Sequence, residues 1–122
     1  MAYDEILASR MTEIFATKAL FDEKKMFGGI CFMVNDKMCA GVVKDEIMAR
    51  IDPAKEEECL AKTGCREMDF TGKKMKGFIM VSPDGIKTRK QLEYYIDLAL
   101  DFNHKAKKSK KKTLELFANK FK

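Results

Sequence analysis

The sequence predicts a single α+β domain in which an antiparallel sheet of about four to five strands packs against helices. Three observations predict it. The N-terminal residues repeat apolar side chains at helical spacing, and short apolar segments in the middle of the chain are separated by residue pairs typical of tight turns. Thr88 and Gln91 form a capping-box pattern ahead of a second helical stripe. At 122 residues the chain is long enough to bury one core.

The first helix is expected to start after Asp4, whose carboxylate can cap free backbone amides, and to end at about Ala19. Its apolar positions follow the spacing i, i+4, i+7, i+8, which places them on one stripe. They are Leu7, Met11, Ile14 and Phe15, with Ile6 beside them.

Three consecutive strands are expected next, joined by two tight turns. Met26 to Val34 predicts the first strand, Met38 to Val43 the second and Ile47 to Ile51 the third. Asn35-Asp36 tolerates the positive φ of a hairpin turn, and Lys44-Asp45 gives the second reversal.

The second half begins with Asp52-Pro53, which predicts the start of a helix. The aspartate can cap free backbone amides, and proline at the first helical position loses no hydrogen bond because an amide there has no partner within the helix. This helix is expected to stop at Gly64, which can adopt the left-handed conformation of a C-terminal cap. The predicted order is therefore α-β-β-β-α-β-α. The remaining elements are Cys65 to Phe70, a turn at Thr71-Gly72, a strand over Met75 to Val81, a turn at Ser82 to Gly85, and a helix from Thr88 to about His104.

The stretch KKMFGG, residues 24–29, is either a small anion-binding loop or the start of a strand. A glycine pair that enters an apolar run more often marks a bulge, a bend or a close backbone approach. Residues 72–77 repeat the glycine-and-lysine composition, but Phe78-Ile79 stands where a phosphate-binding P-loop needs Lys-Ser/Thr. If the two segments converge, they make an anion or partner site from Lys24, Lys25, Gly28, Gly29, Lys73, Lys74 and Lys76.

The net charge of +5 is concentrated at the C-terminus, where residues 103–122 hold eight lysines and one acid. We therefore divide the chain into a domain over residues 1–103 and a basic tail over residues 104–122. The tail ends in a short predicted amphipathic helix with Leu114, Phe117 and Phe121 on one face. A lysine run of this kind either contacts nucleic acid phosphates or only solubilises the terminus. Its lysines are Lys105, Lys107, Lys108, Lys110, Lys111 and Lys112.

No catalytic, metal or cofactor site is predicted. The four cysteines are 8, 20 and 6 residues apart, which matches no zinc pattern, and His104 is the only histidine that could act as a base. Cys31 and Cys39 are expected to face each other across the first hairpin, as buried thiols or as a redox pair. The nine methionines are expected to fill the core, with an adaptable binding groove as the alternative.

The N-terminus shows no secretory signal, and no apolar run is long enough to span a membrane, so the chain is expected in the cytoplasm with reduced thiols.

The order and spacing of several short strings resemble the N-terminal domain of the TfoX/Sxy family over residues 1 to about 103. The strings are Met1 to Glu5, Lys24 to Gly29, Phe32 to Asn35, Met38-Cys39, Met68 to Gly72 and Met75 to Gly77. The resemblance implies a compact α+β domain without catalytic residues or cofactor. The family's longer members are bacterial regulators of natural competence that cooperate with a transcription factor and carry a second, helical domain. Residues 104–122 are not expected to form such a domain.

These expectations combine into a non-enzymatic, cytoplasmic regulatory or interaction module. Its partner is expected to be another protein, such as a transcription regulator, and the module is expected to be a monomer or a homodimer with no membrane contact. Two alternatives stay open: non-specific nucleic-acid binding through the lysine-rich tail, and small-anion binding by the lysines of residues 24–25 and 73–76.

Overall fold

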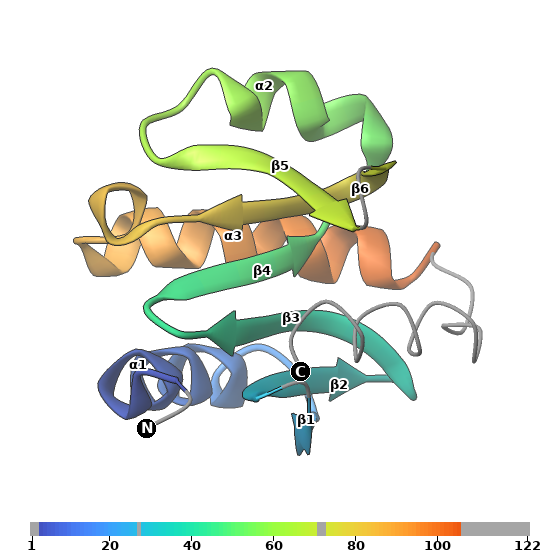
Figure 1. Cartoon of the computed structure of the whole chain (residues 1–122). Coiled ribbons are helices and arrows are strands. Elements are labelled where there is room, and N and C mark those ends of the chain that lie inside the picture. The colour runs from blue at the N-terminus through green and yellow to red at the C-terminus, as the bar shows by residue number, and fades with distance from the viewer. Residues whose placement is uncertain (1–2, 27, 71–72, 106–122) are drawn as a thin grey trace.

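The computed structural model describes residues 3–26, 28–70 and 73–105 of the chain. The described part has an α+β fold, as predicted, with six strands instead of four to five (Figure 1). The helices are α1 (Glu5–Ala16), α2 (Glu56–Leu60) and α3 (Arg89–Asn103), with 3₁₀ turns at Pro53–Lys55 and Pro83–Gly85. The strands are β1 (Asp22–Met26), β2 (Gly29–Val34), β3 (Lys37–Val43), β4 (Glu46–Arg50), β5 (Cys65–Phe70) and β6 (Lys73–Val81).

All six strands form one antiparallel sheet in the order β1-β2-β3-β4-β6-β5. The first four strands follow the chain as a meander. The hairpin of β5 and β6 then inserts β6 next to β4, so β5 becomes the second edge (Figure 1). The predicted order α-β-β-β-α-β-α therefore lacked β1, and it counted one strand where β5 and β6 form two.

The strand predicted from Met26 to Val34 is two strands. Asp22–Met26 pairs with Gly29–Val34 as a hairpin, and Gly28 adopts a φ of 75° in its turn. A Cβ on Gly29 would lie 2.2 Å from the carbonyl oxygen of Val42, so this glycine permits a close backbone approach, as predicted. Phe27 lies outside the described residues.

The predicted helix caps and the predicted turn residues are confirmed. Asp4 Oδ1 accepts hydrogen bonds from the amides of Ile6 and Leu7, and Asp52 Oδ1 accepts one from Ala54. Thr88 and Gln91 form the full capping box. The predicted turn residues Asn35, Asp36 and Lys44 all have positive φ, between 54° and 60°. The turn predicted at Thr71-Gly72 lies outside the described residues.

Helix ends were predicted less well. Helix α1 ends at Ala16 instead of Ala19, and α2 ends at Leu60 instead of running to Gly64. Ile6, placed beside the apolar stripe, is 77% exposed. The stripe itself, from Leu7 to Phe15, is buried as predicted.

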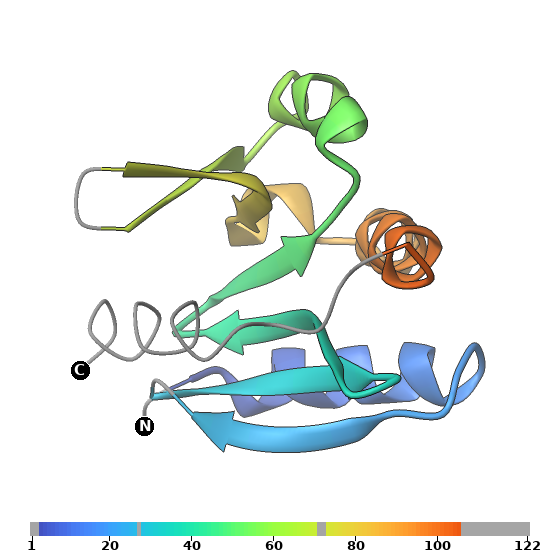
Figure 2. The ribbon, with the colours of Figure 1, turned by 90° about the vertical axis from the view of Figure 1, so that its right-hand side faces the viewer.

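The main core, which we call the helix-side core, lies between the sheet and the helices α1 and α3. Alternate strand residues such as Phe32, Ile47 and Ile79 point into it and meet the apolar stripes of both helices. Figure 2 views the sheet from its side and shows α3 on one side of the strands. The Phe15 and Phe32 rings stack here with centroids 5.0 Å apart.

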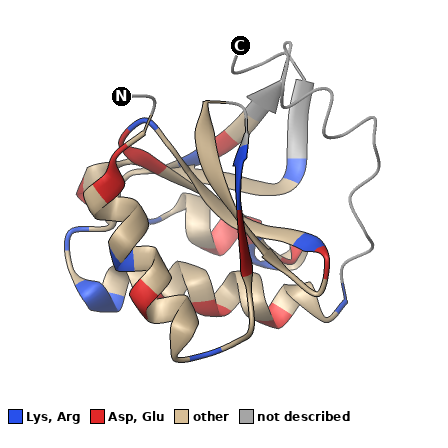
Figure 3. Ribbon diagram, turned by 90° about the horizontal axis from the view of Figure 1, so that it is seen from below, with Lys and Arg blue, Asp and Glu red and all other residues tan. Residues whose placement is uncertain are grey.

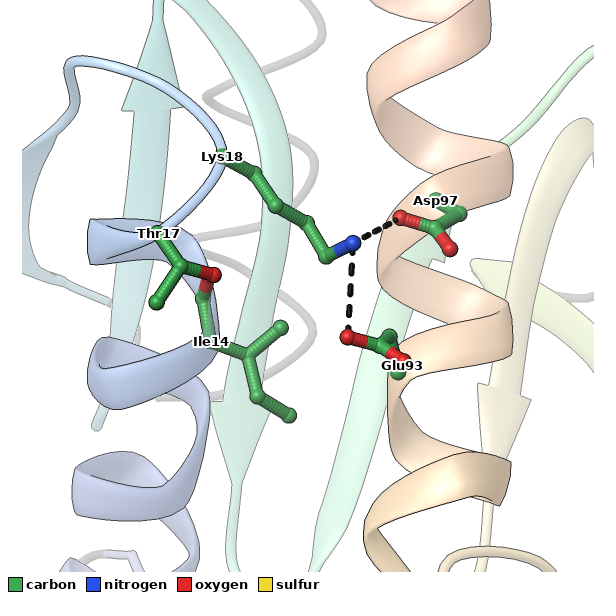
Figure 4. Close-up of polar contacts among 5 residues, drawn as sticks. All are labelled: Ile14, Thr17, Lys18, Glu93 and Asp97. Carbon is green, nitrogen blue, oxygen red and sulfur yellow. Dashed lines mark hydrogen bonds and ion pairs between the residues drawn. The ribbon is translucent and has the colours of Figure 1, made fainter.

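A polar clamp links the end of α1 to the exposed side of α3. The Lys18 ammonium lies 2.9 Å from Asp97 and 3.3 Å from Glu93, one helical turn apart on α3 (Figure 4). The hydrogen bond to Asp97 is the main cause that raises the pKa of Lys18. Arg10, earlier on α1, donates to the backbone carbonyl of Ile86 at 2.8 Å.

The C-terminal end of α3 is attached to the turn between β2 and β3. Asn103 is 2% exposed, and its side-chain amide donates to the carbonyl of Val34 and accepts from the side-chain amide of Asn35. Lys37 donates to the Asn103 carbonyl at 3.0 Å. The chain therefore leaves α3 at the end of the sheet formed by this turn.

Candidate functional site

The two lysine segments singled out in the sequence lie on different parts of the sheet. Lys24 and Lys25 are on β1, and Lys73, Lys74 and Lys76 are on β6. Strands β2, β3 and β4 lie between β1 and β6, which at about 4.8 Å per strand step separates their backbones by about 19 Å. The structure therefore does not bring the two segments together, and these strands do not form the shared anion site.

Each lysine segment also has acidic neighbours. β1 reads Asp-Glu-Lys-Lys-Met, and its first four residues are exposed, which suits an edge strand that must resist pairing with other chains. Figure 3 shows acidic and basic segments interspersed on this side of the molecule. Lys76 lines a groove with Glu56, Glu57 and Glu67, and the amide of Gly77 donates to Glu56. Nearby carboxylates weaken binding of an anion.

The tail is described only as far as Lys105. Its ammonium lies 3.7 Å from Asp52, and this pair is solvent-exposed. The remaining lysines of the predicted nucleic-acid contact lie outside the described residues.

Cys31 and Cys39 do not face each other, and this prediction was wrong. A bulge between Phe32 and Met33 shifts the register of the hairpin, so Cys31 pairs with Gly41. Cys39 belongs to the helix-side core, whereas Cys31 lies on the other face of the sheet. Burial raises the pKa of each thiol to about 12, so both are protonated at neutral pH.

A groove of about 650 Å³ lies between the residues that follow α2 and the first turns of α3. We call it the tyrosine groove. Its main lining residues are Lys62, Thr63, Lys90, Gln91, Tyr94 and Tyr95.

The floor of the tyrosine groove is an aromatic pair. The Tyr94 and Tyr95 rings meet edge to face with centroids 5.1 Å apart, and the Lys62 ammonium lies 4.7 Å from the Tyr94 centroid. Burial, together with the neighbouring Cys59 and Glu58, raises the pKa of Tyr94 to about 12. Tyr94 is therefore a neutral hydrogen-bond donor, and its hydroxyl lies 3.5 Å from Glu58.

Sequence reasoning missed this groove because its walls are brought together by long-range contacts. The amide of Ser82 donates to the carbonyl of Gly64, which holds the loop after α2 against the loop before α3. A Cβ on Gly85 would lie 2.4 Å from the carbonyl oxygen of Thr63, so only glycine allows this approach. The sequence signal that could have indicated it is the adjacent pair Tyr94-Tyr95, of which only Tyr95 fits the buried stripe of α3.

A second apolar cluster lies on the sheet face opposite the helix-side core. We call it the methionine face, and its members are Cys31, Met38, Met48, Met68, Phe78 and Met80. These side chains are between 0% and 7% exposed, and the Cys31 and Met38 sulfurs are 4.0 Å apart. Together with Met11 in the helix-side core, they confirm that these methionines fill buried space.

The described residues place no three His, Cys, Asp or Glu side chains where they could hold a metal ion together. Among the same residues, no helix combines the length and the apolar character needed to cross a membrane.

Comparison with family models decides which family this fold represents. The model described as the TfoX N-terminal domain matches residues 13–103, three quarters of the chain. The chain belongs to the TfoX N-terminal domain family. The match starts within α1 and ends with α3, so it includes the whole sheet and the tyrosine groove. A search of curated proteins found no match to this TfoX N-terminal domain protein.

Proposed function

We propose that this protein is a non-enzymatic, competence-regulator-like interaction module that binds a segment of another protein in the tyrosine groove. Family membership supports a regulatory role of this kind. We choose the tyrosine groove as the binding surface because Tyr94 and Tyr95 line it together with Lys62 and Lys90.

The chemistry of the groove suits a peptide better than a small substrate. Tyrosine gives a large contact area at a low entropy cost and is enriched among the residues that dominate binding energy. Lys62 and Lys90 are exposed, and the Lys62 ammonium lies 4.7 Å from the centroid of the Tyr94 ring. An apolar side chain flanked by carboxylates would pack beside the Tyr94 ring and pair with both lysines.

The non-enzymatic part of the proposal is supported by protonation states. Catalytic bases need a pKa close to the working pH. Burial instead raises the pKa of the Cys59, Cys65, Tyr94 and Tyr95 side chains. His104 is exposed beyond the end of α3, outside the groove lining.

The experiment compares proteins captured from a lysate of the source organism by three immobilised chains. They are the native chain, the double variant Lys62→Glu with Lys90→Glu, and the control Lys25→Glu, which reverses a charge on β1. We expect a protein that the native chain and the control retain and the double variant loses. Thermal melting followed by circular dichroism checks that each variant is folded.

Two results would contradict the proposal. One is equal capture by all three chains, and the other is no specific protein retained by the native chain. Loss with Lys25→Glu alone would instead move the binding surface to β1.

A further inference from the structure

The methionine face is buried although no helix of the described part of the chain contributes a side chain to it. Its six members all belong to strands, and no side chain of α1, α2 or α3 belongs to the cluster. The helices α1 and α3 pack on the opposite face, where they form the helix-side core. One face of an antiparallel sheet reaches 0% to 7% exposure only if another layer of apolar side chains covers it.

The same chain can supply this layer, because the side chains of the methionine face are buried without a second chain. Seventeen residues follow Lys105. Within them, Leu114, Phe117 and Phe121 have the spacing of one apolar helix face, and the polar residues Glu115, Asn119 and Lys120 separate them.

The position at which α3 ends makes this segment available. The Asn103 hydrogen bonds fix the end of α3 at the turn between β2 and β3, and Lys105 lies near Asp52, just after β4. The chain therefore leaves α3 at the end of the sheet formed by the turn between β2 and β3, next to the start of β3, where Met38 lies. Leu114 lies nine positions after Lys105, and an extended chain of nine steps spans about 30 Å.

The dimensions of the segment also match those of the face. A helix from Leu114 to Phe121 is about 10 Å long at a rise of 1.5 Å per residue. Two strand steps, from β2 across β3 to β4, also cover about 10 Å. Such a helix can lie over Cys31, Met38 and Met48, which occupy these three strands.

We propose that the C-terminal segment, residues 113–122, docks on the methionine face of its own chain through Leu114, Phe117 and Phe121. The lysine run then acts as the connection from α3 to this covering segment. The docking does not depend on the tyrosine groove, which lies between α2 and α3.

The first test is methionine oxidation by hydrogen peroxide, read by mass spectrometry of the native chain, Phe117→Asp and the control Asn119→Asp. Asn119 falls on the opposite side of the predicted helix, so the control adds the same charge away from the contact. We expect Phe117→Asp to speed sulfoxide formation at Met38 and Met48 at least tenfold, with Met11 unchanged. Equal rates in all three chains would overturn the proposal.

The second test needs no variant. It therefore remains decisive if Phe117→Asp unfolds the chain, which the first test would show as faster oxidation of Met11. Methionine methyl groups are labelled with ¹³C, and nuclear Overhauser effects to aromatic ring protons are recorded on the full chain. We expect contacts from the Phe117 and Phe121 rings to the Met38 and Met48 methyls. Their absence would overturn the proposal, as would contacts seen only between differently labelled chains, which would identify a second copy as the cover. Solvent-exposed methyls in the purified chain would point to a separate partner.

Discussion

The side-chain amide of Asn103 donates a hydrogen bond of 3.1 Å to the backbone carbonyl of Val34. These residues are 69 positions apart, and Asn103 is 2% exposed. The bond joins the last residue of α3 to the last residue of β2. Together with the hydrogen bonds from Asn35 and Lys37 to Asn103, it fixes the position of the end of α3.

Replacing Asn103 with alanine should destabilise the fold by about 1–3 kcal/mol, because the Val34 carbonyl would remain buried without this donor. Urea unfolding of the variant measures the loss. Asp101→Ala is the matched control, since Asp101 is exposed on the same helical turn. A loss no larger than that of the control would contradict the structural role of Asn103.

The two glycines of KKMFGG should differ in their response to alanine. Gly29→Ala should cost about 3 kcal/mol or more, since its Cβ would overlap the Val42 carbonyl oxygen and the sheet would have to move. Gly28→Ala should cost about 1–2 kcal/mol, because alanine is strained at a φ of 75°.

Gly28→Asn separates these two causes, since asparagine tolerates the left-handed conformation. We expect the free energy of unfolding of this variant to stay close to that of the native chain. If Gly28→Ala and Gly29→Ala lower the free energy of unfolding by the same amount, the described hairpin between β1 and β2 is wrong.

Stability should fall as the pH rises from about 9 toward 12. The thiols of Cys31 and Cys39 have a pKa near 9.0 when unfolded and about 12 in the folded chain. Above pH 9 the unfolded state loses these protons while the folded state keeps them, so unfolding becomes more favourable. Below pH 9 this contribution is constant.

Urea midpoints of the native chain, Cys31→Ala and Cys39→Ala at pH values from 7 to 11 check this dependence. At pH 7 the urea midpoint of each variant should be lower than that of the native chain. Above pH 9 the midpoint of each variant should decline less steeply with pH. A variant with the native slope would show that the thiol it removes is not protected from ionisation.

The clamp at Lys18 should make a small, salt-dependent contribution to stability. Lys18→Met removes the ion pairs with Asp97 and Glu93, which are partly exposed, and surface pairs of this kind are screened by salt. We expect a slightly lower melting temperature at low salt and no difference from the native chain in 1 M NaCl. A difference that persists in 1 M NaCl would mean that packing of the lysine stem matters more than its charge.

The alternative function, nucleic-acid binding through the tail, makes its own prediction. Replacing Lys107, Lys108, Lys110, Lys111 and Lys112 with glutamine keeps Leu114, Phe117 and Phe121 in place. If the tail binds phosphates, this variant loses affinity for labelled DNA or RNA at low salt, and the salt dependence becomes shallower. Equal affinity of both chains would exclude the tail as the contact.

The local features of the fold were predictable because short-range interactions decide them. The caps at Asp4, Asp52 and Thr88 satisfy amides within three residues, and the Asn35-Asp36 turn needs only residues that tolerate positive φ. The family resemblance also came from strings along the chain. By contrast, β1 was missed because Asp-Glu-Lys-Lys has little intrinsic preference for a strand, and it forms one by pairing with β2.

The candidate sites were the least predictable part, because each depends on which strands become neighbours. Strands β2, β3 and β4 separate Lys24 and Lys25 from Lys76, and the insertion of β6 beside β4 places Met48 next to Met80. A bulge of one residue moved Cys39 to the face away from Cys31, since side chains alternate along a strand.

The sequence by itself determined the α+β class, the helix starts, the hairpin turns and the family. Only the tertiary structure decided that Tyr94 and Tyr95 line an open groove, that the lysine segments stay apart, and that a methionine-rich face lies opposite the helices. The physical reason is the range of the interactions. Caps and turns are completed by neighbours in the chain, whereas strand order and register depend on contacts between distant residues that no local pattern records.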